Sequence, residues 1–89
     1  MRELVLFTSP TCVPCKTLKP RLLALSEELG FAYSIIEAGP QSMKMFESLK
    51  VRSVPTFMCV EDGKEVGSIV GVKPDEAIKV ALNQWGFGK

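Results

Sequence analysis

The chain has 89 residues, a mass of 9.8 kDa and a formal net charge of +1, values that describe a small and nearly neutral protein. With 46% hydrophobic and 24% charged residues, its composition is that of a globular domain and not of a disordered chain. We expect one domain over residues 1–89, without the electrostatic attraction that captures nucleic acid or an acidic membrane surface.

The sequence contains no histidine, which excludes catalytic triads, general bases and metal sites that depend on imidazole. Its longest apolar runs, such as residues 4–7, are far shorter than the roughly 18 residues of a spanning helix. The N-terminus lacks a secretory pattern, and three cysteines do not suit an extracellular disulfide framework. We therefore expect a soluble, cytoplasmic monomer that binds neither membrane nor nucleic acid.

The first half of the chain predicts a strand, a helix and a second strand. Residues 3–8 form an apolar run without alternation, which is typical of a central strand buried on both faces. The hydroxyls of Ser9 and Thr11 are expected to cap a helix over residues 13–29, which Gly30 ends. A stripe of leucines at helical spacing supports this helix: Leu18, Leu22, Leu25 and Leu29.

The rest of the chain completes the order β-α-β-α-β-β-α. A strand over Phe31–Ile36 is followed by a short helix marked by Met43, Phe46 and Leu49. Next come a strand over Thr56–Val60, an Asp-Gly turn and a strand over Glu65–Val70. The last element is a helix from Pro74, and its predicted buried residues are Ala77, Ile78, Ala81, Leu82 and Trp85. A helix between the first two strands makes them parallel neighbours. The order predicts an α/β fold with a four-stranded mixed sheet flanked by helices.

The residues that carry chemistry are Cys12 and Cys15, a Cys-x-x-Cys motif where the first strand passes into the first helix. A helix N-terminus offers unpaired N–H groups and a partial positive charge, and both stabilise a thiolate. We expect Cys12 to be the more accessible sulfur and Cys15, one turn inside, to lie within bonding distance of it. Lys16 is expected to be a solvated residue with a weak effect.

Two other interpretations of the pair are weaker. A zinc site would need two more ligands, and without histidine only carboxylates and the third cysteine could supply them. Two buried structural cysteines do not suit a loop that starts a helix, because such loops are usually exposed. A Cys-x-x-Cys beside a βαβ pattern is instead typical of a thioredoxin-like redox motif. Cys59, inside an apolar run, is expected to be a small core residue.

The chain resembles the thioredoxin family over nearly its whole length. Residues 12–16, Cys-Val-Pro-Cys-Lys, resemble the family's Cys-Gly-Pro-Cys-Lys, Pro20 falls where the family has a helix-kinking proline, and residues 51–56 resemble the segment with its cis-proline. The resemblance implies a thioredoxin-like fold that lacks the leading strand and helix of full-length thioredoxins. It also implies a dithiol chemistry that uses no metal and no bound cofactor.

The resemblance also suggests where a substrate binds. Sequence alone would assign the Val54–Pro55 bond as trans, because only about 5 to 6% of X-Pro bonds in folded proteins are cis. The resemblance implies the cis isomer beside the active-site sulfurs, with the backbone of Val54 free to pair with a substrate strand. It further implies that Gly71 helps to form the adjacent groove and that Val13 and Pro14 contact the substrate.

Three residues depart from the family pattern. Leu6, six residues before Cys12, stands where thioredoxins keep a buried aspartate that assists proton transfer. Thr11 replaces a tryptophan before the motif, and Val13 replaces a glycine within it. We expect these changes to alter the redox potential, the rate and the choice of reductase while leaving activity in place.

We predict a thiol–disulfide oxidoreductase that reduces protein disulfides. Cys12 attacks the substrate, and Cys15 resolves the mixed disulfide. A thioredoxin-reductase-type enzyme or glutathione would supply the electrons. The alternatives are a glutaredoxin-like donor, for example to a ribonucleotide reductase, and a thioredoxin-fold protein-binding module with weakened catalysis. A metal or copper carrier that uses the same two cysteines is a third.

Overall fold

The computed structural model describes residues 2–87 and contains four strands and three helices in the predicted order. In chain order these are β1 (Arg2–Thr8), α1 (Val13–Leu29), β2 (Ser34–Glu37), α2 (Met43–Ser48), β3 (Thr56–Glu61), β4 (Lys64–Val70) and α3 (Asp75–Gln84). The strands form one sheet in the order β2-β1-β3-β4. Strand β1 is parallel to β2 and antiparallel to β3, and β3 pairs antiparallel with β4. The mixed sheet is therefore confirmed.

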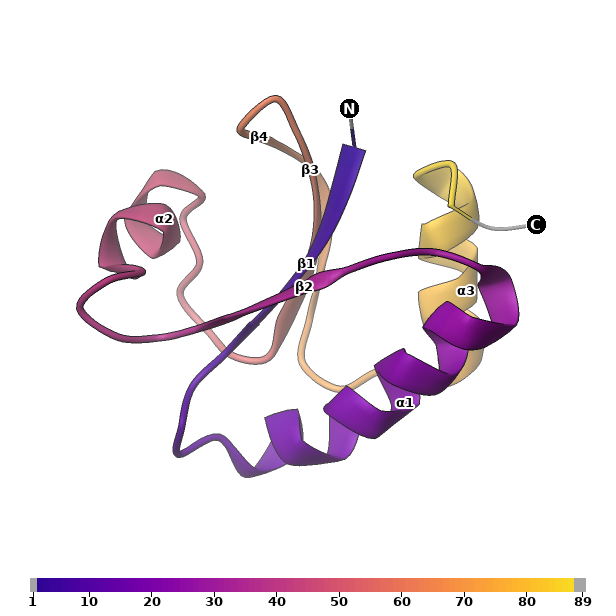
Figure 1. Ribbon diagram of the computed structural model, residues 1–89, viewed down its shortest axis with the longest axis horizontal. Helices are drawn as coiled ribbons and strands as arrows, with labels where there is room; N and C mark the ends of the chain where they lie inside the picture. The colour runs from indigo at the N-terminus through magenta and orange to yellow at the C-terminus, as the bar shows by residue number, and fades with distance from the viewer. Residues whose placement is uncertain (1, 88–89) are drawn as a thin grey trace.

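The helices lie on both faces of the sheet, as Figure 1 shows: α1 and α3 on one side and α2 on the other. The larger core cluster joins buried residues of α1 and α3 to one face of β1 and β3, and it includes Leu6, Leu22, Cys59, Leu82 and Trp85. The smaller cluster lies on the α2 side, where Phe7 meets Phe46 edge to face at 5.1 Å. Strand β1 contributes to both clusters because its successive side chains point to opposite faces.

The ends of three strands meet at one edge of the sheet. Phe7 of β1 pairs with Thr56 of β3, and Thr56 pairs with Val70 of β4. The chain therefore leaves β1, enters β3 and leaves β4 at the same edge. This edge receives the segments 9–16, 51–55 and 71–74. We call them the disulfide end of the molecule, because the first of them contains Cys12 and Cys15, which are joined by a disulfide.

The structure corrects three details of the predicted elements. Strand β2 begins at Ser34 and not at Phe31, because the Phe31 N–H still bonds to the Ser26 carbonyl in the left-handed cap that Gly30 forms. Ala77 is exposed and not buried, since the buried stripe of α3 follows Ile78 and Leu82 on another side of the helix. The third correction is the residue that caps α1.

That cap is Cys12, whereas the sequence suggested a hydroxyl from Ser9 or Thr11. The Cys12 sulfur accepts a hydrogen bond of 3.2 Å from the N–H of Cys15, and the two hydroxyls lie near each other instead, at 3.4 Å. The residue that caps the helix is therefore also one of the two predicted redox cysteines.

Candidate functional site: a disulfide at the start of a helix

Cys12 and Cys15 are joined by a disulfide across the first turn of α1, with their Cα atoms 5.3 Å apart. The turn is built by local sequence. Cys12 has an extended backbone at the cap position, and Pro14 lies in the first helical turn, where the missing N–H of a proline leaves no hydrogen bond unmade. The N–H of Cys12 bonds back to the carbonyl of Ser9 and closes the turn that leads from β1 into the helix.

The two cysteines differ in exposure as the sequence predicts. Cys12 keeps 9% of its surface exposed and Cys15 only 1%. Cys12 lies at the positive end of the helix dipole, with the N–H of Cys15 directed at its sulfur. Both features stabilise a thiolate at Cys12 once the disulfide is reduced. The geometry therefore suits attack through Cys12 and resolution through Cys15.

The loops around the disulfide hold the other residues that the sequence singled out. The Val54–Pro55 peptide bond is cis, Pro55 is fully buried, and the hydroxyl of Thr56 donates a 2.7 Å hydrogen bond to the carbonyl of Ser53. Gly71 has a φ of 86° and donates its N–H to the carbonyl of Pro55 at 2.8 Å. A side chain at Gly71 would have space, so it is the backbone conformation that favours glycine there.

The exposed members of the predicted set flank the disulfide on the surface. Val13 is 69% exposed, Pro14 is exposed and Val54 is half-buried. Among residues 2–87, the backbone N–H and carbonyl of Val54 make no hydrogen bond. The structure thus brings all seven predicted residues to the disulfide end.

Two side chains of β1 lie behind the site. Leu6 has no exposed surface and belongs to the core cluster between the sheet and α1, so this position carries no titratable group. Thr8 is also fully buried, and its hydroxyl has no hydrogen-bond partner within residues 2–87. Because an unpaired buried hydroxyl destabilises the fold, Thr8 is an unusual choice beside the redox pair.

The third cysteine is separate from the site. Cys59 lies in β3 with no exposed surface, inside the larger core cluster, which confirms its predicted structural role. Burial raises the pKa of the Cys59 thiol, and nearby Glu61 raises it further while Arg2 acts in the opposite direction. Cys59 is therefore held as a neutral thiol.

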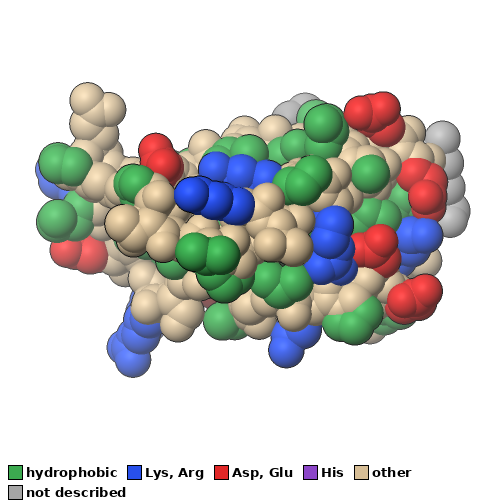
Figure 2. All heavy atoms as spheres, turned by 90° about the horizontal axis from the view of Figure 1, so that it is seen from below, with side chains coloured by type: hydrophobic (Ala, Val, Ile, Leu, Met, Phe, Trp, Pro, Cys, Tyr) green, Lys and Arg blue, Asp and Glu red, His purple; other side chains and the backbone are tan. Residues whose placement is uncertain are grey.

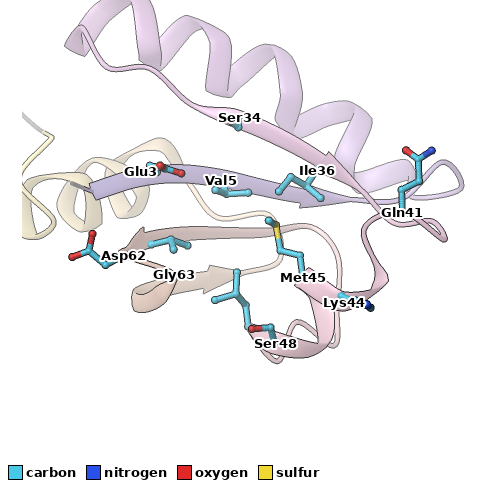
Figure 3. A pocket seen from close by; sticks show the side chains of 12 residues that line it. Glu3, Val5, Ser34, Ile36, Gln41, Lys44, Met45, Ser48, Asp62 and Gly63 are labelled. Atoms are coloured by element: carbon cyan, nitrogen blue, oxygen red, sulfur yellow. The ribbon is translucent and has the colours of Figure 1, made fainter.

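A hollow of about 660 Å³ lies elsewhere, between α2 and the sheet. Figure 3 shows the side chains of Val5 and Ile36 on its sheet side and Met45 reaching toward them from α2. It contains none of the three cysteines, so it takes no part in thiol chemistry. Within residues 2–87, no group of three or more His, Cys, Asp and Glu side chains is placed to hold a metal ion.

Three basic residues at or next to the disulfide end were not singled out from the sequence: Arg52 and Lys73 within it, and Arg21 on α1. Arg21 of α1 donates to the carboxylate of Asp75, with distances of 3.0 and 2.7 Å, and to the carbonyl of Lys73. It therefore fastens the segment after β4 to α1. Arg52 and Lys73 are exposed on the two loops beside the disulfide. A linear sequence gives no signal that distant loops meet, and these residues looked like ordinary solvated charges.

The fold and the paired cysteines define a dithiol–disulfide oxidoreductase, and comparison with known proteins agrees. The thioredoxin family model matches residues 2–84, so the chain belongs to the thioredoxin family. It is 33% identical over 79 residues to a thioredoxin of Bacillus subtilis, covering 88% of this chain and 76% of that protein. It is 38% identical over 78 residues to a thioredoxin of Chlamydia muridarum, covering 84% and 74%.

Solved structures give the same result for the fold. Thioredoxin f from spinach chloroplast, in its short form, matches with a TM-score of 0.82 at 25% identity, covering 94% of this chain and 75% of that one. Thioredoxin f2 of Chlamydomonas reinhardtii matches with a TM-score of 0.81 at 26% identity, covering 99% and 82%. No helix within residues 2–87 is long and apolar enough to cross a bilayer.

Proposed function

We propose that this protein reduces disulfide bonds of other proteins, with Cys12 as the nucleophile and Cys15 as the resolving cysteine. The observation that carries the proposal is the asymmetry of the pair: Cys12 caps α1 and is the more exposed sulfur, whereas Cys15 is buried behind it. A thiolate at Cys12 is stabilised by the helix N-terminus and reached from solvent, which are the two requirements for attack on an external disulfide.

The two cysteines supply both electrons that the reduction needs. The Cys12 thiolate attacks one sulfur of the substrate disulfide, which forms a mixed disulfide and releases the first substrate thiol. Cys15 loses its proton and attacks the Cys12 sulfur, so that the second substrate thiol leaves and Cys12–Cys15 becomes a disulfide. Two electrons pass from the pair to the substrate; Cys15 supplies one proton, and water supplies the other because Cys12 reacts as a thiolate. The aliphatic side chain of Leu6 cannot accept the proton of Cys15, so that proton passes to water or to the departing thiolate.

The loops beside the disulfide would hold the substrate chain. The unpaired backbone groups of Val54 are suited to pair with an extended substrate segment, in the manner of strand addition. Val13, Pro14, Pro55 and Gly71 would form the surface around it. These residues supply contacts, and the chemistry needs only the two sulfurs.

A reductase would return electrons to the pair. This is supported by a neighbour of the same fold, a thioredoxin f2 solved in complex with ferredoxin:thioredoxin reductase. Glutathione is the competing electron donor and would indicate a glutaredoxin-like cycle. A reducing compartment such as the cytoplasm suits both donors.

The test is dithiothreitol-driven reduction of insulin, followed by the turbidity of the released chains. The wild-type protein should accelerate precipitation, Cys12→Ser should not, and Cys59→Ala should match the wild type because Cys59 lies in the core. Retained turnover in Cys12→Ser would refute the assignment. Absence of acceleration by the wild type would instead favour the binding-module alternative.

A further inference from the structure

The disulfide end is one connected surface and not three separate loops. The Gly71 N–H bonds to the carbonyl of Pro55 at 2.8 Å, which joins the segment after β4 to the segment before β3. Arg21 of α1 bonds to the carbonyl of Lys73 and pairs with Asp75, which joins the same segment to the helix that carries the disulfide. The backbones of these segments are therefore held together beside the helix that carries the disulfide.

This surface carries three exposed positive charges that form no ion pair in the described part of the chain. Lys16, Arg52 and Lys73 are exposed, one from each segment, and none of them forms an ion pair within residues 2–87. The segments 9–16, 51–55 and 71–74 contain no Asp or Glu. Three unpaired cations around one redox centre therefore produce a positive potential at the point where a substrate disulfide must arrive.

Carboxylates next to the three segments offset this potential only in part. Asp75 follows the third segment but is paired with Arg21 at 2.7 Å. Glu37 reaches the same edge at the end of β2, where β1 separates it from β3 and β4. Glu65 of β4 lines the same small hollow as Arg52, without an ion pair to it within residues 2–87. The opposite edge is different, because the β3–β4 turn carries Glu61 and Asp62 against Lys64, and Glu61 pairs with Arg2 at 2.9 Å.

Apolar side chains stand among the three cations. Val13 is 69% exposed and Val72 is 40% exposed, and half-buried Val54 lies on the segment between them. Figure 2 views the molecule from below, the side toward which the start of α1 points in Figure 1. Basic and hydrophobic side chains are interspersed over the middle of that view, and most of the acidic side chains lie toward one end.

We propose that this surface selects polypeptide disulfides whose cysteines are flanked by acidic residues. This preference rests on the proposed reductase function. The substrate would be an extended segment whose apolar side chains contact Val13 and Val72. Its Asp or Glu side chains would face Lys16, Arg52 and Lys73. Complementary charge acts mainly on the rate of encounter, and salt screens it. The preference should therefore appear in kcat/KM and fade as ionic strength rises.

The experiment compares two peptides of equal length, each with one internal disulfide and the same apolar residues. One carries Asp and Glu beside its cysteines, and the other carries Lys at those positions. Pre-reduced wild-type protein should reduce the acidic peptide roughly tenfold faster at low salt. The ratio should approach one at about 0.5 M salt, where the screening length is only a few ångströms.

Charge-reversal variants locate the effect. Arg52→Glu and Lys73→Glu should each lower the acidic-to-basic rate ratio several-fold, whereas Lys64→Glu, at the opposite edge, should leave it unchanged. All three change the net charge by the same amount. An equal loss in Lys64→Glu would show that only overall charge matters and would overturn the proposal, as would equal rates for both peptides with wild-type protein.

Two further outcomes are distinguishable. If wild-type protein reduces neither peptide nor insulin, the reductase function itself fails. If oxidised glutathione, whose carboxylates offer the same charge, is reduced as fast as the acidic peptide and with the same salt dependence, the surface recognises a small anionic disulfide and the polypeptide part of the proposal is wrong. Slow reduction of glutathione disulfide beside fast reduction of the acidic peptide supports it.

Discussion

Cys12 and Cys59 are the same residue type in two regions of the molecule, and the two regions lead to opposite chemistry. Cys12 follows a strand and caps a helix, so the N–H of Cys15 faces its sulfur and part of the residue's surface is exposed to solvent. Cys59 lies within β3, surrounded by the leucines and aromatic rings of the larger core cluster, where burial raises the pKa of its thiol. Position in the fold, and not residue identity, decides which cysteine reacts.

The largest expected effect is in thiol reactivity. In the reduced, folded protein, Cys12 should react with iodoacetamide more than about 100-fold faster than Cys59, because the reaction needs an accessible thiolate. Peptide mapping by mass spectrometry over time measures both rates. Denaturation should remove the difference. Comparable labelling of Cys59 in the folded protein would break the contrast between the two regions.

The packing of the core around Cys59 can be tested at Gly67 of β4, which packs against the indole ring of Trp85. A Cβ there would lie 3.0 Å from Cε2 and 3.1 Å from Cζ2 of the indole, and closer still to Nε1. Gly67→Ala should lower the free energy of unfolding by about 2 kcal/mol, because the packed ring must shift. Urea denaturation measures this change.

Gly39→Ala is the matched control. Its Cβ would meet nothing within 4 Å, so its effect should stay below about 0.5 kcal/mol. At temperatures where both variants are folded, insulin reduction should be unchanged, because neither glycine belongs to the disulfide end. A strong loss of reductase activity in folded Gly67→Ala would mean that the core and the site are coupled.

Thr8 lies at the end of β1, between the core and the disulfide end, and its buried hydroxyl provides a test of stability there. Its buried hydroxyl has no partner within residues 2–87, so Thr8→Val, which keeps the shape, should raise the free energy of unfolding by about 1 kcal/mol. Thr56→Val should do the reverse by a similar amount, since the equally buried Thr56 hydroxyl bonds to Ser53 at 2.7 Å. Destabilisation by Thr8→Val would indicate that the hydroxyl is hydrogen-bonded in solution.

The smallest effect concerns the pH dependence of stability. The pKa of Cys59 is raised in the folded state, so the folded form holds this proton more tightly than the unfolded form. The contribution of this proton to the free energy of unfolding is complete at pH values below the pKa of Cys59 in the unfolded chain. It is lost as the pH rises through the pKa of Cys59 in the folded protein. In the oxidised protein, Cys59→Ala should therefore flatten the fall in stability as the pH rises above the ordinary thiol pKa of about 8.5. An unchanged slope would contradict the raised pKa.

The sequence predicted the element order because each element has a strong local signal. Three signals need no tertiary information. The continuous apolar run before Cys12 indicates a buried strand, the leucine stripe of α1 indicates a helix, and Asp62-Gly63 indicates a hairpin turn. The Cys-x-x-Cys motif needed only its place between a strand and a helix. The paired cysteines were therefore predictable to the residue.

Two of the corrected details are local, and the sequence pattern did not distinguish them from their alternatives: capping by the Cys12 sulfur and the late start of β2 after the Gly30 cap. The exposed side of Ala77 and the contacts between distant segments depend on tertiary packing. The bonds from Arg21 to the segment at Lys73 join residues more than fifty positions apart. The basic surface around the disulfide becomes visible only when these segments are brought together.

The most direct test of the redox cycle is a covalent trap. Cys15→Ser, incubated with the oxidised acidic peptide, should stop at a mixed disulfide, and mass spectrometry should locate one peptide on Cys12 and none on Cys59. The adduct should disappear with dithiothreitol. A peptide attached to Cys59, or full turnover by Cys15→Ser without any adduct, would contradict the assignment of Cys12 as nucleophile and Cys15 as resolving cysteine.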